Sequence, residues 1–192
     1  MNCFDPIGEP ALADYWLGLL GTAEETAVEE HLFGCDECGE RLRRMIALVG
    51  GVRKLAREGC LRMVVSEAFL KRMEEEGSRI RQYTVPAGGE VRCTVTADDD
   101  LLIARLAAGM SEARRVDLSI CDGAGVERLR MSDIPFRPEA GSVVYQESIT
   151  YAKAAPGNEM IMRLLALDEA GEHPLAEYVF HHTRSLPGPG GW

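Results

Sequence analysis

The chain has 192 residues, which is enough for one large domain or two small ones. Hydrophobic residues make up 46% and charged residues 27%, which argues against disorder along the whole chain. The formal net charge of −10 disfavours nucleic acid as a direct partner, because phosphate binding needs a clustered cationic surface. No apolar run is long enough for a membrane helix, and the N-terminus lacks the features of a signal peptide. We therefore expect a cytoplasmic protein whose six cysteines are thiols or metal ligands rather than disulfides.

The first part of the chain has the periodicity of amphipathic helices. Residues 10–20 carry apolar side chains on one face, and Gly21 is expected to end this helix. The residues at 22–25 have the pattern of a capping box, which predicts a second helix over 22–33. Gly34 is expected to end that helix as a left-handed residue.

Two further helices are predicted after this point. The third covers residues 36–49 and is expected to break at Gly50 and Gly51, and the fourth covers residues 52–76. The fourth carries more apolar side chains than a small bundle can bury, and such patches usually mark a protein interface. Packing on the chain's own β domain, or a homodimer, would cover the same face. The residues predicted to contact a partner are Val52, Leu55, Val64, Val65, Phe69, Leu70 and Met73.

From about residue 79 the apolar residues alternate with polar ones, as in strands that bury one face. The alternation is clear over residues 116–121, and it recurs in several short runs separated by turns rich in glycine, proline and aspartate. The run Asp98–Asp100 is predicted to be a solvated turn. Seven or eight strands at this spacing predict an all-β sandwich or barrel. The predicted organisation is a helical domain at 1–78, a β-sandwich domain at 79–186 and a disordered tail at 187–192.

A His-x3-Cys-x2-Cys pattern lies between the second and third predicted helices, at His31, Cys35 and Cys38. Zinc prefers a tetrahedron of thiolate sulfur and imidazole nitrogen, and the first turn of a helix favours a thiolate at Cys38. A structural site needs a fourth ligand, which Cys3 can supply. A chance or redox pair of cysteines, and a mobile N-terminal thiol at Cys3, are the alternatives. We expect one structural or redox-sensitive zinc site held by Cys3, His31, Cys35 and Cys38.

The other cysteines and histidines give weaker signals. Cys60 is expected to be packed rather than ligating, and Cys93 and Cys121 occupy strand positions as small core or surface residues. His181 and His182 are neighbours, so on a strand they point to opposite faces and cannot easily share a metal. A second metal site is therefore the less favoured interpretation of these histidines.

Three segments together resemble the N-terminal zinc-binding domain of bacterial anti-sigma factors: Leu12–Leu20, Thr22–Glu25 and Val28–Cys38. The capping box, helix and ligand triplet come in the order typical of that family, and the resemblance covers about residues 1–75. It implies that the four residues named above are the metal ligands. It also implies a partner, an extracytoplasmic-function sigma factor whose contact with RNA polymerase is blocked. In that family a fourth helix lies between two sigma domains, a role implied here for residues 52–73.

The sequence thus predicts a small all-α zinc-binding domain followed by an all-β sandwich. An immunoglobulin-like sandwich is favoured over a cupin-like barrel, because the histidine pattern of a metal-binding cupin is missing. The predicted function is that of a soluble anti-sigma factor, with a zinc-stapled interaction adaptor as the alternative. An enzyme is disfavoured, since the sequence has no Gly-x-Ser-x-Gly motif, no Walker loop and no dinucleotide-binding glycine motif after a strand.

Overall fold

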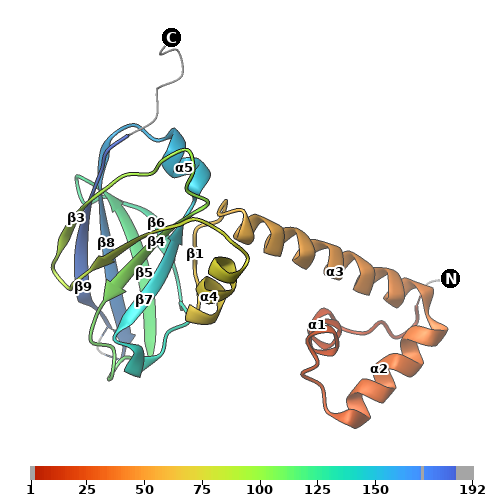
Figure 1. The fold of residues 1–192 in the computed structure, drawn as a ribbon. Coiled ribbons are helices and arrows are strands. Elements are labelled where there is room, and N and C mark those ends of the chain that lie inside the picture. The colour runs from red at the N-terminus through yellow and green to blue at the C-terminus, as the bar shows by residue number, and fades with distance from the viewer. Residues whose placement is uncertain (1–2, 170, 185–192) are drawn as a thin grey trace. The chain divides into compact units, whose positions relative to one another are not determined.

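The computed structural model describes residues 3–169 and 171–184 (Figure 1). The chain forms two compact units, Met1–Leu55 and Ala56–Trp192, which we call the N-terminal unit and the C-terminal unit and describe separately. Helices come first and a β sandwich follows, so the expected fold class is confirmed. The tail expected at 187–192 lies outside the described residues. Within the described ranges, no helix is both long enough and apolar enough to cross a membrane.

The N-terminal unit contains three helices, α1 (Glu9–Leu17), α2 (Thr22–Gly34) and the first part of α3 (Asp36–Arg57). The first of them ends three residues earlier than expected, because Gly18 adopts the left-handed conformation with a φ of 67°. The backbone N–H of Leu19 then donates to the carbonyl oxygen of Asp14 at 2.8 Å, which closes the last turn.

The two ends of α2 also differ in detail from the expectation. The capping interaction lies one residue earlier, because the carboxylate of Glu24 accepts the backbone N–H of Gly21 at 3.2 Å. Gly34 is the last helical residue rather than a left-handed cap. Cys35 follows it in an extended conformation with a φ of −132°. The chain therefore turns at the first cysteine of the Cys-x2-Cys pair.

The expected break at Gly50 and Gly51 is wrong, since α3 continues through both residues. A glycine in a helix costs only about 1 kcal/mol relative to alanine, which contacts elsewhere can offset. Two such contacts lie on either side of the glycine pair. Arg41 donates to the carbonyl oxygen of Ile7 at 2.8 Å, and the guanidinium of Arg53 lies 4.7 Å from the ring centre of Trp16.

The long helix expected over residues 52–76 is wrong as well. After α3 the chain forms a short strand, β1 (Met63–Val64), and then a separate helix, α4 (Glu67–Glu75). Two consecutive valines at this point favour extended backbone over helix. Ser66 begins α4, because its hydroxyl accepts the backbone N–H of Phe69 at 3.2 Å.

The segment from Ala56 to residue 78 is part of the C-terminal unit, whereas the sequence placed it with the helices. Leu70 is buried in a small apolar cluster with Ile103 and Val144. Strand β1 pairs with β7 of the sandwich, which ties the segment to the sheet. These contacts give residues 56–78 a role in the β fold that their helical periodicity did not predict.

The C-terminal unit is built from two sheets that lie face to face, with a short helix, α5, near one end (Figure 1). One sheet has the strand order β1-β7-β4-β2 and the other β3-β9-β8-β5-β6. The remaining elements are β2 (Ile80–Val85), β3 (Glu90–Cys93), β4 (Leu101–Ala107), β5 (Arg115–Asp122), β6 (Glu127–Met131), a 3-10 turn (Pro138–Ala140), β7 (Ser142–Glu147), α5 (Ile149–Ala154), β8 (Asn158–Asp168) and β9 (Gly171–His182).

The topology is mixed. Strands β2 and β4 are parallel, as are β3 and β9, while the other pairs are antiparallel. Consecutive strands β2 and β3 join different sheets, so the chain crosses the sandwich between them. The main core lies between the sheets and includes Tyr145 from one and Tyr178 from the other. The sheets do not close into a barrel in the described residues, so the cupin-like alternative is wrong, and the immunoglobulin-like subclass stays a prediction.

The aspartate run at 98–100 is more than a solvated turn. Asp99 is only 7% exposed, because its carboxylate binds Arg81 at 3.1 Å and accepts the backbone N–H of Thr96 at 2.7 Å. The neighbouring Asp100 accepts the backbone N–H of Arg79 at 2.8 Å. The run therefore fastens the loop before β4 to the start of β2.

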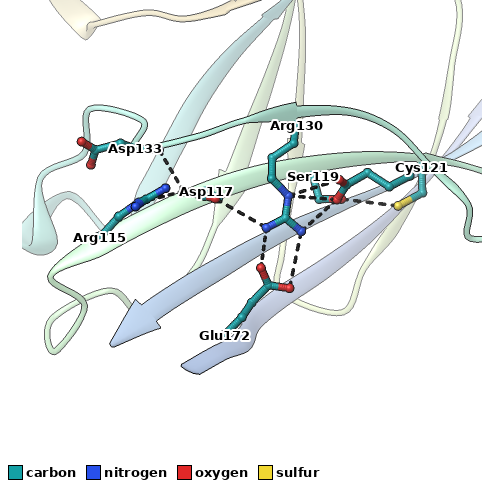
Figure 2. A network of polar contacts seen from close by, with 8 residues as sticks. Arg115, Asp117, Ser119, Cys121, Arg130, Asp133 and Glu172 are labelled. Carbon is teal, nitrogen blue, oxygen red and sulfur yellow. Dashed lines mark hydrogen bonds and ion pairs between the residues drawn. The ribbon is translucent and has the colours of Figure 1, made fainter. Parts of the chain in front are cut away.

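A polar network covers the outer face of the five-stranded sheet (Figure 2). Asp117 is buried on β5 and accepts the backbone N–H of Asp133 at 2.8 Å, next to ion pairs with Arg115 and Arg130. Arg130 on β6 also pairs with Glu172 of β9. Asp133 has a φ of 52°, a left-handed backbone that the Asp117 hydrogen bond helps to hold. The network thus links three strands and a strained turn.

Candidate metal centre

Four side chains from separate parts of the N-terminal unit converge on one point. His31 lies in the last turn of α2, Cys35 follows that helix, and Cys38 lies in the first turn of α3. Cys3 approaches from the segment before α1. The turn at Cys35 lets the two helices present ligands to the same place. The sequence prediction of these four residues as one cluster agrees with where the structure places them.

The separations fit a zinc tetrahedron. All four candidate ligand atoms lie within 4.8 Å of one another. The Cys3 sulfur lies 3.5 Å from His31 Nε2 and 3.9 Å from the Cys38 sulfur. With Zn–S bonds of about 2.3 Å and Zn–N bonds of about 2.0 Å, the edges of a tetrahedron measure about 3.5 to 3.8 Å. The residues would therefore need to move very little to bind one zinc ion.

The donor set is also right for zinc chemically. Three thiolates and one imidazole are soft or borderline ligands, which suit zinc better than magnesium or calcium. Four protein ligands close the coordination sphere and leave no position for a substrate, as in structural zinc sites. The geometry and chemistry of the cluster fit a single zinc site held by Cys3, His31, Cys35 and Cys38.

The thiols differ in how readily they ionise. A hydrogen bond from the backbone N–H of Cys38 lowers the pKa of the Cys35 thiol to about 7. Desolvation, together with the neighbouring Cys35 thiol, raises the pKa of Cys3 to about 11. Zinc displaces protons from its thiol ligands, so metal binding at neutral pH must release the proton of Cys3.

Contacts around the cluster hold Cys3 in place, although it lies outside any helix. Its backbone N–H donates to the carboxylate of Glu37 in the first turn of α3 at 2.8 Å. Arg41, one turn further on, holds the carbonyl oxygen of Ile7. Sequence reasoning named Cys3 but not these two anchors. The signal that could have found them is the position of Glu37 and Arg41 on α3 immediately beside the Cys-x2-Cys pair.

The remaining cysteines are not members of the cluster. Cys60 lies in the loop after α3, where its sulfur is 3.6 Å from the Thr150 hydroxyl oxygen. Cys93 and Cys121 are buried strand residues, as expected. Burial raises the pKa of the Cys93 thiol to about 11, which keeps it protonated at neutral pH.

The residues predicted to bind a partner divide into two groups. Val52 and Leu55 on α3 are 48% and 43% exposed, as an interface requires. The others lie in the C-terminal unit, where Val65, Leu70 and Met73 are buried and Val64 and Phe69 pack against core clusters. Those five side chains are engaged inside the chain's own fold and do not form a free surface, which corrects the prediction.

The sequence prediction included only part of an apolar row on α3, because it left out Leu48. Leu48 is 68% exposed and lies at helical spacing before Val52 and Leu55, so the three side chains share one side of the helix. The spacing is present in the sequence. The assumed break at Gly50 and Gly51 separated Leu48 from the other two and hid it.

A small helical domain with a closed three-cysteine, one-histidine site is a zinc-finger type of domain. Residues 9–39 match a family described as "Putative zinc-finger", which is the family of the N-terminal zinc domain of anti-sigma factors. The matched range contains His31, Cys35 and Cys38, and Cys3 lies just before it. The resemblance noted from the sequence is therefore confirmed for this segment.

Comparison with other proteins adds little beyond this match. The chain is similar to the N-terminal domain of phage TP901-1 ORF48, with a TM-score of 0.37 and 14% identity over 56% of this chain and 99% of that one. It is also similar to CopC from Methylosinus trichosporium OB3b, with a TM-score of 0.29 and 12% identity over 66% and 98%. No curated protein matches the sequence. At these TM-scores neither likeness bears on function.

Proposed function

We propose that the protein is an anti-sigma factor, which binds an extracytoplasmic-function sigma factor and keeps it from RNA polymerase. The observation that carries the proposal is the cluster of four ligands. Three of them lie within the segment that matches the zinc-domain family of anti-sigma factors, and Cys3 lies just before it. In this proposal zinc organises the N-terminal unit and takes no part in chemistry. The protein acts by binding a protein partner rather than by catalysis or direct contact with nucleic acid.

The partner surface in this proposal is one side of α3. Leu48, Val52 and Leu55 form an exposed apolar row, spaced as one face of a helix. A helix that presents such a row commonly binds in an apolar groove of a partner. Burying each side chain would contribute about 1.5 to 3 kcal/mol, so the row would supply much of the affinity of the complex.

The second candidate is a zinc-stapled adaptor that uses the same surface for another protein. The exposed row alone fits both functions, because it supports an apolar contact with a protein and carries no information on which protein binds. The family match of residues 9–39 favours the sigma factor. The two candidates differ in what the protein captures from its own cell and in whether that capture changes transcription.

The test is affinity capture of the full-length, zinc-loaded protein in its native bacterium, followed by mass spectrometry. We expect one sigma factor to be the dominant partner. Val52→Asp should abolish its capture, since the substitution places a charge in the apolar row. Ala47→Asp is the matched control, because Ala47 is exposed on a different side of the same helix and its substitution should leave capture intact.

Two results would contradict the proposal. One is a dominant partner that is not a sigma factor, which would favour the adaptor. The other is equal loss of capture in both variants, which would mean that the apolar row is not the contact surface. Zinc content is measured in parallel, so that loss of capture through unfolding is recognised.

A further inference from the structure

The C-terminal unit has an apolar cavity between its two sheets, at the end of the sandwich where α5 lies. Its walls come from β2, β4 and β7 of one sheet, from β3, β8 and β9 of the other, and from α5 itself. Sequence patterns do not reveal it, because its lining is spread over seven elements. Large side chains in its lining include Tyr83, Leu102, Tyr145, Met160, Met162 and Phe180.

One polar atom in this apolar lining has no partner. The Nε2 atom of His182 is fully buried and makes no hydrogen bond within the described chain. His182 is paired in register with Asn158 on one side and Cys93 on the other, and it follows Tyr178 and Phe180 in the inward row of β9. A buried polar atom left without a hydrogen bond loses its bonds to water and gains nothing in return, which is unfavourable. A ligand that forms a hydrogen bond with His182 Nε2 would therefore be favoured at this position.

Three other polar side chains at the cavity, Glu147, Tyr145 and Tyr83, are already hydrogen-bonded. The Glu147 carboxylate binds Arg62 at 2.5 Å, the Tyr145 hydroxyl at 3.0 Å and the backbone N–H of Ser148 at 2.8 Å. The Tyr83 hydroxyl is held by the backbone of Thr94 at 2.9 Å. No charged side chain that lines the cavity is free to neutralise a charged ligand, so an uncharged one is favoured.

The size of the cavity limits the ligand further. About 50 Å³ is open to the centres of water-sized molecules. A single water needs roughly 10 to 15 Å³ on this measure, so the space suits a few waters or one organic molecule of about the size of a benzene ring. Met160 and Met162 line it with flexible, polarisable side chains that can adjust to such a molecule.

We propose that this cavity binds a small, uncharged, mainly apolar molecule with one hydroxyl or carbonyl group that hydrogen-bonds to His182 Nε2. The apolar walls supply the affinity and the histidine selects for the polar group. This binding site lies wholly within the C-terminal unit and does not depend on the zinc cluster or on the proposed sigma-factor partner. A substituted phenol is the simplest molecule of this class.

The test is a titration of the full-length, zinc-loaded protein, labelled with ¹³C at its methionine methyl groups, against phenol and against toluene. The two compounds have nearly the same shape, and only phenol carries a hydrogen-bonding group. We expect phenol to shift the Met160 and Met162 signals with an affinity roughly 3- to 10-fold above that of toluene. The signal of Met45, in the other unit, should not move.

Two variants separate the role of His182 from general effects on the fold. His182→Leu should bring the affinity for phenol down to that for toluene while toluene still binds. His181→Leu is the matched control, because His181 faces the outer side of the sheet, against Glu90 and Glu159, and its variant should keep the preference.

Either of two results would overturn the proposal. If neither compound shifts the Met160 and Met162 signals of the wild type up to its solubility limit, the cavity holds no organic ligand of this class. If the preference for phenol is absent from the wild type, or is still present in His182→Leu, then a hydrogen bond to His182 does not select the ligand.

Discussion

Exchange of Cys38 for serine should unfold the N-terminal unit and leave the C-terminal unit folded. Among residues 3–55 the buried apolar side chains are Leu12, Val28 and Cys38 itself. Full burial of Leu12 and Val28 contributes about 1.5 to 3 kcal/mol each. Two such side chains make a very small core for a unit of some fifty residues, and domains with so little core usually depend on a metal or on disulfides for their stability. A structural zinc site supplies about 10 to 16 kcal/mol, which makes the metal the decisive term.

The assay combines zinc analysis with circular dichroism. The wild type should carry one zinc per chain, and Cys38→Ser should carry none. The helical signal should fall sharply, because α1, α2 and α3 have 9, 13 and 22 residues, while α4 and α5 have only 9 and 6. The thermal transition of the β sandwich should not change.

Cys60→Ser is the matched control, because Cys60 lies outside the cluster and should affect neither zinc nor helicity. Full helicity in a zinc-free Cys38→Ser protein would refute the reasoning, since it would show that the small apolar core is sufficient.

Three more predictions concern protonation and packing. Zinc affinity, measured against a competing chelator, should rise at least about tenfold per pH unit from pH 6 to 8, because Cys3, with a pKa of about 11, must lose its proton on binding throughout this range. The rise should be steepest below the pKa of Cys35, about 7, where the Cys35 thiol must lose a proton too, and an affinity that does not change with pH would contradict this. In denaturant titrations, Asp117→Ala should lower the free energy of unfolding of the C-terminal unit by about 2 to 4 kcal/mol, because Asp117 is buried in its ion pairs. Glu172→Ala, at the exposed end of the same network, should lower it by less than about 1 kcal/mol, and equal effects of the two variants would mean that the burial of Asp117 is unimportant. Leu70→Asp should destabilise the same unit by about 3 to 5 kcal/mol, because Leu70 packs against Ile103 and Val144. An unchanged stability would mean that Leu70 is not held in this cluster and is again a candidate for binding a partner.

The metal centre was predictable because most of its signal is local. His31, Cys35 and Cys38 lie within eight consecutive residues, and their spacing survives any error in the helix boundaries. Cys3 was harder, since its approach depends on Glu37 and Arg41 holding the N-terminal segment against α3. The change from helical to alternating periodicity likewise predicted the two-part fold, because it depends only on which residues face a core.

The parts that could not be predicted depend on tertiary contacts. Glycine pairs often end helices, but Arg41 and Arg53 make contacts on either side of Gly50 and Gly51, so the helix continues. Leu70 has a helical pattern that fits an exposed docking helix equally well. Its burial against Ile103 and Val144 depends on tertiary contacts, among them the pairing of β1 with β7 just before α4. The cavity beside His182 had no sequence signal, because residues from seven elements meet there.

The measurement that tests the central claim most directly is transcription in vitro by RNA polymerase holoenzyme that contains the captured sigma factor. The zinc-loaded protein should suppress transcription from the promoter of that sigma factor when added in equimolar amount. The Cys38→Ser protein should not suppress it, because the unit that presents the α3 surface is unfolded. Transcription that is unaffected by the zinc-loaded protein, or suppressed equally by Cys38→Ser, would contradict the account of a zinc-organised anti-sigma factor.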